Sequence, residues 1–220
     1  TLCISALYGG TGAMCDEHMN SIRPAIIWMD RRAEQEAEEL ASSIGEDPIF
    51  QTSRNGIDSY FGYTKLLWVK KHEPDNWSKI RHIIPIHSYI IYKMTGQLTV
   101  DYCSAGNVGG IYDYNKHVWS EEMCNLMGIP YNALPHDFHN PYDIIGHLNE
   151  EYQSKLGLNS SVSICAGTVD CIASMLSAGI VQPGDNAAIL GTSLNWGFIH
   201  NSVPNNPSLI SMPYCISPQT

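Results

Sequence analysis

Residues 166–179 read AGTVDCIASMLSAG, and this stretch predicts a strand, a tight turn and a helix in succession. The preceding residues, 162–166 (VSICA), are short and apolar, as in a buried strand, and Gly179 stands where a helix commonly ends. The helix between them, 171–178, is apolar on all sides, so we expect it to be buried. Asp170 is the one charged residue of the stretch.

Two interpretations of Asp170 follow from this position. Its carboxylate can cap the helix by accepting hydrogen bonds from the free backbone N–H groups of the first turn. Alternatively, a carboxylate at the carboxyl end of a strand, in front of a helix, faces an active-site crevice. The local pattern leaves both open.

Strands and helices alternate along the rest of the chain, which predicts the α/β class. Expected strands cover 2–7, 24–29, 81–85, 143–147, 162–166 and a hairpin of 187–190 with 196–199. Expected helices cover 31–44 after an Asp30 cap, 63–72, 86–95, 121–127 after a Ser120 cap and 150–156 after an Asn149 cap. The first helix should turn its Glu residues to solvent, and the third should bury Ile86, Tyr89, Ile90 and Met94.

Composition excludes several function classes. The 220 residues carry a net charge of −10 and no basic cluster beyond the pairs Arg31-Arg32 and Lys70-Lys71, which disfavours nucleic-acid binding. No segment suits a membrane helix or a signal peptide. The seven cysteines form an odd count without a C-x-x-C pair, which indicates a reducing cytoplasm. His136 and His139 have neither a Cys nor a third His nearby, so no metal site is assigned to them.

The two ends of the sequence predict a longer protein. The first residues, TLCISALYGG, contain no initiating Met, and residues 186–220 contain no Asp, Glu, Lys or Arg. An uncharged segment of this length favours contact with a partner surface. We therefore expect the 220 residues to be the middle part of a longer chain.

A family resemblance rests on five segments in order. Residues 60–72, YFGYTKLLWVKKH, resemble the signature of the FGGY carbohydrate kinases, with Gly62 where the family usually has Ser, Thr or Pro. The other matching segments are RPAIIWMDRRA (23–33), YKMTGQLTVDYCSAG (92–106), IIGHL (144–148) and the region from 157 to LGTS (190–193).

This resemblance implies an incomplete ribonuclease H-like fold of the actin/hexokinase type, with sugar and ATP meeting between two α/β domains. Residues 1–182 would form most of the sugar-binding domain and 183–220 the start of the nucleotide-binding domain. ATP and Mg²⁺ are the implied cofactors, but the family's first phosphate loop and adenine site have no counterpart here, so we expect these residues alone to be inactive. The implied partner is a small-molecule sugar, and a homodimer is left open.

The resemblance also implies roles for individual residues. Asp170 aligns with the catalytic aspartate, which takes the proton of the acceptor hydroxyl during phosphoryl transfer. The segment Gly191, Thr192 and Ser193 would lie near the transferred phosphate, where turn N–H groups and hydroxyls suit an anion. Tyr60 and Trp28 would contact the acceptor, although core packing is the alternative for both.

Three further places in the sequence depart from the family pattern: the segment 8–10, Cys171 and His87. Tyr8, Gly9 and Gly10 fall where glycerol kinases carry Arg-Glu and pentulose kinases Gln-Met-His, which predicts a roomier, less charged pocket for a pentulose, larger ketose or polyol rather than glycerol. Cys171 stands where Asn or Gln is frequent beside the catalytic aspartate, so one expected hydroxyl partner is missing. His87 replaces a usual Asp, and Asp101 with Ser104 keeps a motif interpreted as structural.

Two rival functions remain. A sugar-binding or regulatory protein could keep the fold without transferring phosphate, which the departures at Gly9, Gly10 and Cys171 permit. A hydrolase could use Cys171 as nucleophile at the helix start, although no His is placed to serve it.

Overall fold

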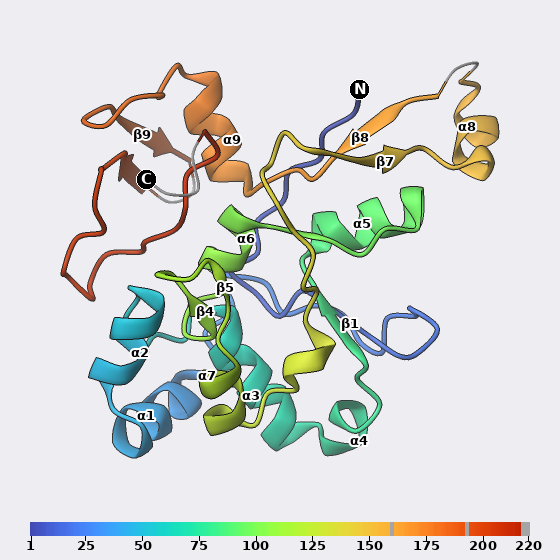
Figure 1. The fold of residues 1–220 in the computed structure, drawn as a ribbon. Helices are drawn as coiled ribbons and strands as arrows, with labels where there is room; N and C mark the ends of the chain where they lie inside the picture. Colours follow the sequence, from blue (N-terminus) through green and yellow to red (C-terminus); the bar gives the residue numbers. More distant parts are fainter. Residues whose placement is uncertain (159–160, 192–193, 217–220) are drawn as a thin grey trace.

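The computed structural model describes residues 1–158, 161–191 and 194–216, and within these the chain mixes helices and short strands (Figure 1). The helices are α1 Glu34–Ser43, α2 Glu46–Ser53, α3 Gly62–His72, α4 Pro74–Trp77, α5 Ile86–Thr95, α6 Tyr102–Asn107, α7 Glu121–Met127, α8 Glu150–Leu156 and α9 Asp170–Ser177. The strands are β1 Ala13–Cys15, β2 His82–Ile84, β3 Val100–Asp101, β4 Tyr112–Asp113, β5 Val118–Trp119, β6 Phe138–His139, β7 Ile144–His147, β8 Ser163–Cys165, β9 Asn186–Leu190 and β10 Leu194–Phe198.

The strands pair in twos. β1 with β2, β4 with β5, β7 with β8 and β9 with β10 are antiparallel, whereas β3 and β6 run parallel. The expected hairpin near residues 187–199 is therefore confirmed as β9 and β10, with Leu190 opposite Leu194. The expected strand 2–7 is reduced to two isolated parallel bridges, Leu2 to Ile164 and Ser5 to Thr168, beside β8.

The expected strand 24–29 is wrong. Ile26 is tied to Thr11, donating its N–H to Oγ1 over 3.0 Å and accepting from the Thr11 N–H over 3.1 Å. The Asp30 N–H then donates to the Ile27 carbonyl, which turns the chain before a strand can extend. Pro24 supplies no N–H to a ladder either, so the apolar run forms a loop with Ile27 and Met29 exposed.

Two of the three expected helix caps are confirmed. Ser120 Oγ accepts from the Met123 N–H and Asn149 Oδ1 from the Tyr152 N–H, at the starts of α7 and α8. The Asp30 cap is wrong, because α1 begins at Glu34, four residues later. Asp30 instead accepts from the Arg32 N–H and pairs with the Arg32 guanidinium.

Two helices bury other residues than the sequence pattern predicts. α5 has the expected bounds but buries His87, Ser88 and Ile91, while Ile90 is exposed. In α1, Glu36 is buried, with His72 Nε2 3.1 Å from its carboxylate. Lys71 Nζ, also on α3, lies 3.7 Å from the same carboxylate. A carboxylate next to a cation of another helix can turn inward, which the periodicity of one helix does not show.

The helix of the opening stretch is not buried all round. α9 buries Ile172 and Met175, whereas Leu176 is exposed. These two residues pack in a small apolar cluster with Val169, Ile199 and Tyr214. The larger core surrounds α3, where Tyr63, Leu66 and Val69 are fully buried.

The segment after β10 returns to the body formed by the first helices. Asn55, just after α2, donates from Nδ2 to the Ser211 carbonyl over 2.9 Å and accepts the Ser211 N–H at Oδ1 over 2.7 Å. A Cβ on Gly106 would lie 2.4 Å from Pro213 Cδ, so α6 and this segment touch closely. The returning segment thereby faces α9 and β10 across an open space described below.

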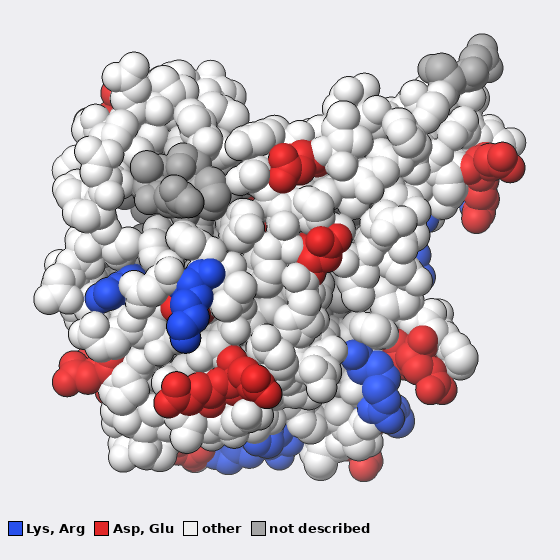
Figure 2. Space-filling model, viewed as in Figure 1, with Lys and Arg blue, Asp and Glu red and all other residues white. Residues whose placement is uncertain are grey.

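On the face shown in Figure 2, charged side chains gather over the body formed by the first helices, and few lie around α9, β9 and β10. Among the described residues no helix is both long and apolar enough to cross a membrane.

Candidate active site

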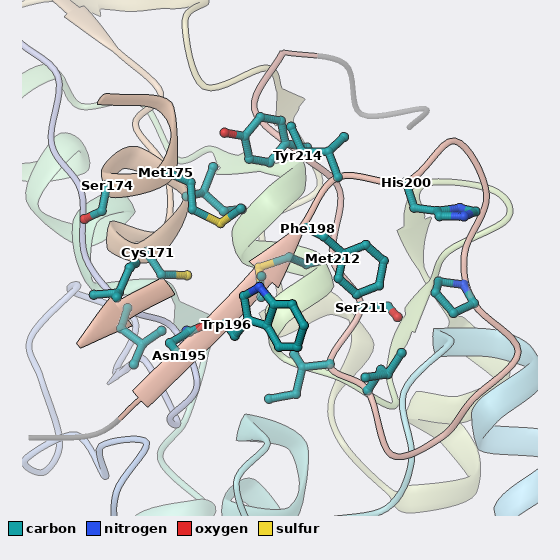
Figure 3. A pocket seen from close by; sticks show the side chains of 18 of the residues that line it. Cys171, Ser174, Met175, Asn195, Trp196, Phe198, His200, Ser211, Met212 and Tyr214 are labelled. Atoms are coloured by element: carbon teal, nitrogen blue, oxygen red, sulfur yellow. The ribbon is translucent and has the colours of Figure 1, made fainter. Parts of the chain in front are cut away.

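One pocket, of about 720 Å³, lies between α9, the β9–β10 hairpin and the returning segment (Figure 3). Figure 3 shows Cys171, Ser174 and Met175 presented by α9 and Trp196 and Phe198 by β10. The described residues that line it are Leu7, Trp28, Tyr60, Tyr114, Asp170, Cys171, Ile172, Ser174, Met175, Ile189, Gly191, Leu194, Asn195, Trp196, Gly197, Phe198, Ile199, His200, Ser202, Val203, Pro204, Ser208, Leu209, Ile210, Ser211, Met212 and Tyr214.

The pocket unites five residues that the sequence assigned to a site. Trp28, Tyr60, Asp170, Cys171 and Gly191 all line it. Asp170 is the one carboxylate among the described lining residues, which include neither Lys nor Arg. A polyhydroxyl molecule suits such a lining, because apolar faces pack against its carbons while a few polar groups fix its hydroxyls. Thr192 and Ser193 lie outside the described residues.

Asp170 is exposed at the first residue of α9. Its Oδ1 accepts from the Cys171 N–H over 2.7 Å, so the carboxylate does bind a free N–H of the first turn. The N-cap position itself belongs to Val169, which corrects the capping interpretation by one residue. A negatively charged side chain in the first turn interacts favourably with the helix dipole and so supports the start of α9.

The turn before Asp170 depends on Gly167. Its φ is +77°, and a Cβ there would stand 2.1 Å from the Ile4 carbonyl oxygen. Only glycine fits that approach, since backbone atoms cannot give way as side-chain ends do. Gly167 thereby lets β8 pass directly into α9 and carries Asp170 to the pocket.

Trp28 and Tyr60 form an aromatic wall of the pocket. Their ring centroids are 6.5 Å apart in an edge-on arrangement, and Tyr60 Oη accepts from Asn107 Nδ2 over 3.4 Å. Burial raises the pKa of Tyr60, and the nearby Cys171 and Asp170 add to this rise. The Tyr60 hydroxyl is therefore a neutral hydrogen-bond donor within electrostatic reach of Asp170.

None of Tyr8, Gly9 and Gly10 lines the pocket. Tyr8 is buried in the main core. A Cβ on Gly10 would stand 2.0 Å from the Ile26 carbonyl oxygen, and one on Gly9 3.0 Å from Tyr60 Cζ. The room predicted at this place is filled by the Ile26 backbone and the aromatic wall, because the loop around Trp28 closes onto both glycines.

Cys171 does not have the environment of a nucleophile. Burial, with a smaller contribution from Asp170, raises the pKa of its thiol to about 11. A thiolate is the reactive form of cysteine, and catalytic cysteines have a lowered pKa instead. The structure therefore speaks against the hydrolase alternative.

The sequence analysis assigned no role to two groups of residues in or beside the pocket. Asn195, Trp196 and two parts of the returning segment, 202–204 and 208–212, line the pocket but belong to no motif. Only the uncharged composition of the segment indicated an interface. Lys65 is fully buried behind the aromatic wall, and its place among apolar α3 residues was the available signal.

The described residues contain no group of three His, Cys, Asp or Glu side chains that could hold a metal ion. His87 and Asp101 form a buried pair instead, with Nε2 2.8 Å from Oδ2, and Asp101 Oδ1 caps α6 through the Ser104 N–H. The structural interpretation of this motif fits these contacts.

Comparisons with known proteins agree on one family. The model of the FGGY family of carbohydrate kinases, N-terminal domain, matches residues 2–177. The chain is 30% identical over 179 residues to xylulose kinase of Staphylococcus xylosus and 28% identical over 180 residues to that of Bacillus subtilis. These alignments cover 81% and 82% of this chain and 36% of each relative, so the chain spans just over a third of their length.

Solved structures agree with the family model. The crystal structure of xylulose kinase from Rhodospirillum rubrum superposes with a TM-score of 0.85 at 26% identity, over 92% of this chain and 42% of that one. The predicted actin/hexokinase-type, ribonuclease H-like fold is thus confirmed for the part aligned. Because the family model spans most of the sequence, from residue 2 to residue 177, the chain belongs to the FGGY family of carbohydrate kinases.

Proposed function

We propose that this chain forms most of the sugar-binding part of a kinase that phosphorylates a hydroxyl group of a pentulose or a related ketose or polyol. Residues 1–182 would form the sugar-binding domain and residues 183–220 the start of the nucleotide-binding domain. The main support for the proposal is that Asp170 lines the same pocket as the aromatic wall of Trp28 and Tyr60. The relatives named xylulose kinases favour D-xylulose as the first acceptor to test.

Asp170 would act as the general base. The acceptor oxygen bonds to the γ-phosphorus of ATP as the bond from that phosphorus to ADP breaks, and the acceptor proton passes to the Asp170 carboxylate. ATP, with Mg²⁺, supplies the phosphoryl group and the charge neutralisation. The Cys171 N–H holds one carboxylate oxygen, and this fixes the direction of the other.

The aromatic wall would orient the acceptor. The Trp28 ring offers an apolar face to the carbon chain, while the Tyr60 hydroxyl can donate a hydrogen bond because Asn107 occupies one of its acceptor positions. Gly191, at the end of β9, leaves open space where a Cβ would stand, so a phosphate can approach its backbone. Residues for Mg²⁺ are not assigned, because no suitable group of carboxylates occurs among the described residues.

A coupled ADP-release screen of the whole protein over ketoses, aldoses and polyols tests the proposal. We expect a pentulose to give the highest kcat/KM, and the 220 residues alone to show no turnover, since they correspond to about a third of the relatives' length. Glycerol as the best substrate would contradict the acceptor class. Sugar binding without ADP release by the whole protein would instead favour a non-catalytic sugar-binding or regulatory role.

A further inference from the structure

Lys65 lies fully buried on α3, among the apolar side chains of the main core. A buried ammonium group is costly unless its N–H groups are satisfied. Lys65 Nζ donates to the Ser59 carbonyl over 2.7 Å, to the Gly9 carbonyl over 3.2 Å and to the Tyr60 carbonyl. Three donors therefore meet three backbone acceptors.

Two of these carbonyls belong to the pocket wall and its neighbour, namely to Tyr60 in the aromatic wall and to Gly9 beside it. Gly9 lies 56 positions from Lys65 and packs directly against the Tyr60 ring, which in turn stands beside Trp28. The ammonium group thus ties the segment around Gly9 to the turn that carries Tyr60. No other side-chain hydrogen bond of the described residues joins Gly9 to this turn.

We propose that Lys65 is a positioning residue of the sugar site, whose ammonium group fixes Gly9 and Tyr60 so that the Tyr60 ring and hydroxyl keep their place for the acceptor sugar. This inference rests on the proposed function for the identity of the ligand. Lys65 itself does not line the pocket and acts through Tyr60. Its loss should therefore weaken sugar binding more than it slows the transfer step.

The charged neighbours of Lys65 give the inference a pH dependence. Burial, with a smaller contribution from Arg31, lowers the pKa of Lys65 to about 8 against the opposing effect of Asp30 and Asp58. Above this pH the neutral amine has two N–H donors for three carbonyls. One of the hydrogen bonds that hold Gly9 and the Tyr60 turn together is then lost.

Neither tyrosine near Lys65 loses its proton near pH 8, because burial raises the pKa of both. The Tyr60 ring, 5.8 Å from Nζ, and Tyr8 both have a raised pKa. Arg31 is paired with Asp58 at 2.6 Å, and Asp30 with Arg32 at 2.6 Å. A loss of sugar affinity through this pH range therefore reports on Lys65.

The variant Lys65→Met removes the donors and keeps the length of the side chain. Lys70→Met is the matched control, because Lys70 lies on the same helix and also donates to a backbone carbonyl, that of Met127, over 3.0 Å, away from the pocket. Hydrogen exchange of peptides covering 7–12 and 57–62 and calorimetric binding of D-xylulose are measured in the whole protein.

We expect Lys65→Met to speed exchange in both peptides and to raise the Kd and KM for sugar by roughly tenfold or more, the size of a lost charged hydrogen bond, with a smaller change in kcat. Lys70→Met should change exchange only near Met127. Unchanged exchange in peptides 7–12 and 57–62 overturns the positioning role, and faster exchange with unchanged sugar affinity overturns its relevance to the site.

If Lys65→Met fails to fold, the pH dependence of sugar binding by the unaltered protein tests the inference instead. The Kd for sugar should rise as the pH passes about 8, and a constant Kd up to about pH 9.5 would refute the inference. A protein that binds and phosphorylates no sugar refutes the proposed function separately, and the exchange measurements then still decide whether Lys65 holds the wall.

Discussion

Gly9 lies directly against Tyr60: a Cβ added to Gly9 would stand 3.0 Å from Tyr60 Cζ and 3.1 Å from Trp28 Cβ. This contact is tight for any side chain, but the tip of the Tyr60 ring can shift by a few tenths of an ångström. Gly10, one residue later, faces the Ile26 backbone oxygen at 2.0 Å, which cannot shift in this way. The two adjacent glycines therefore have different roles: Gly9 leaves room for the pocket wall, and Gly10 allows the Ile26 backbone to pass close by.

The variants Gly9→Ala and Gly10→Ala distinguish these two roles. We expect Gly9→Ala to push the Tyr60 ring and to raise the KM for sugar several-fold with a small change in melting temperature. Gly10→Ala should destabilise the fold by roughly 1–3 kcal/mol or more, as overpacking does. Thermal melting and sugar kinetics of both variants check this, and equal effects on stability would contradict the distinction.

Asp170→Asn tests the general base. Asn can still accept the Cys171 N–H, so the start of α9 should persist and stability should change by well under the ~1 kcal/mol typical of a lost cap. Because the amide cannot take the acceptor proton, kcat should fall by at least ~10²-fold with near-normal sugar binding.

Asp185→Asn is the matched control for this change. Asp185 also accepts from backbone N–H groups, those of Val181 and Gln182, but does not line the pocket. It should keep its turnover. An Asp170→Asn variant that retains most activity, or that loses it only through unfolding, would remove Asp170 from the mechanism.

The thiol of Cys171 should be slow to react. With the pKa raised from 9.0 to about 11, its thiolate fraction near pH 8 is about a hundredfold below that of the same residue in the unfolded chain. Alkylation by iodoacetamide, followed by mass spectrometry with and without urea, measures the ratio. Rapid labelling in the folded protein, or loss of turnover in Cys171→Ser beyond a few-fold, would reopen a role for the thiol.

Lys65 should also contribute a pH-dependent stability. It releases its proton near pH 8 in the folded chain but only near 10.5 when unfolded, so between these values the unfolded chain binds more protons. Stability from this group therefore rises with pH over that window, while sugar affinity falls.

The measurement is the difference in unfolding free energy between the unaltered protein and Lys65→Met, from urea titrations at about pH 7 and about pH 9.5. Cys15 and Cys124, whose burial raises the pKa, titrate with the opposite effect on stability but equally in both proteins, so they cancel. If this difference in unfolding free energy is the same at both pH values, the pKa of Lys65 is not lowered in the folded protein.

Features that depend on residues close together in the chain were predictable from the sequence. Ser120 and Asn149 cap their helices, and Gly128 and Gly157 end them with φ of +64° and +66°, because side-chain and backbone groups a few positions apart satisfy one another. The family was recognisable for the same reason, because its signature, residues 60–72, is one continuous segment that ends with α3. The placement of Asp170 at the start of an apolar helix was also predictable, because it depends only on the residues around it.

Contacts between residues far apart in the chain became visible only in the folded structure. The loop around Ile26 closes onto Gly10, Glu36 turns inward toward His72, and Lys65 is buried against Gly9, all through contacts that no periodicity encodes. The pocket likewise needs Trp28, Asp170 and the segment returning from β10, which Asn55 holds at Ser211 across 156 positions. Burial and hydrogen bonding across such separations depend on the packed whole, because each buried polar group takes its partner wherever the fold supplies one.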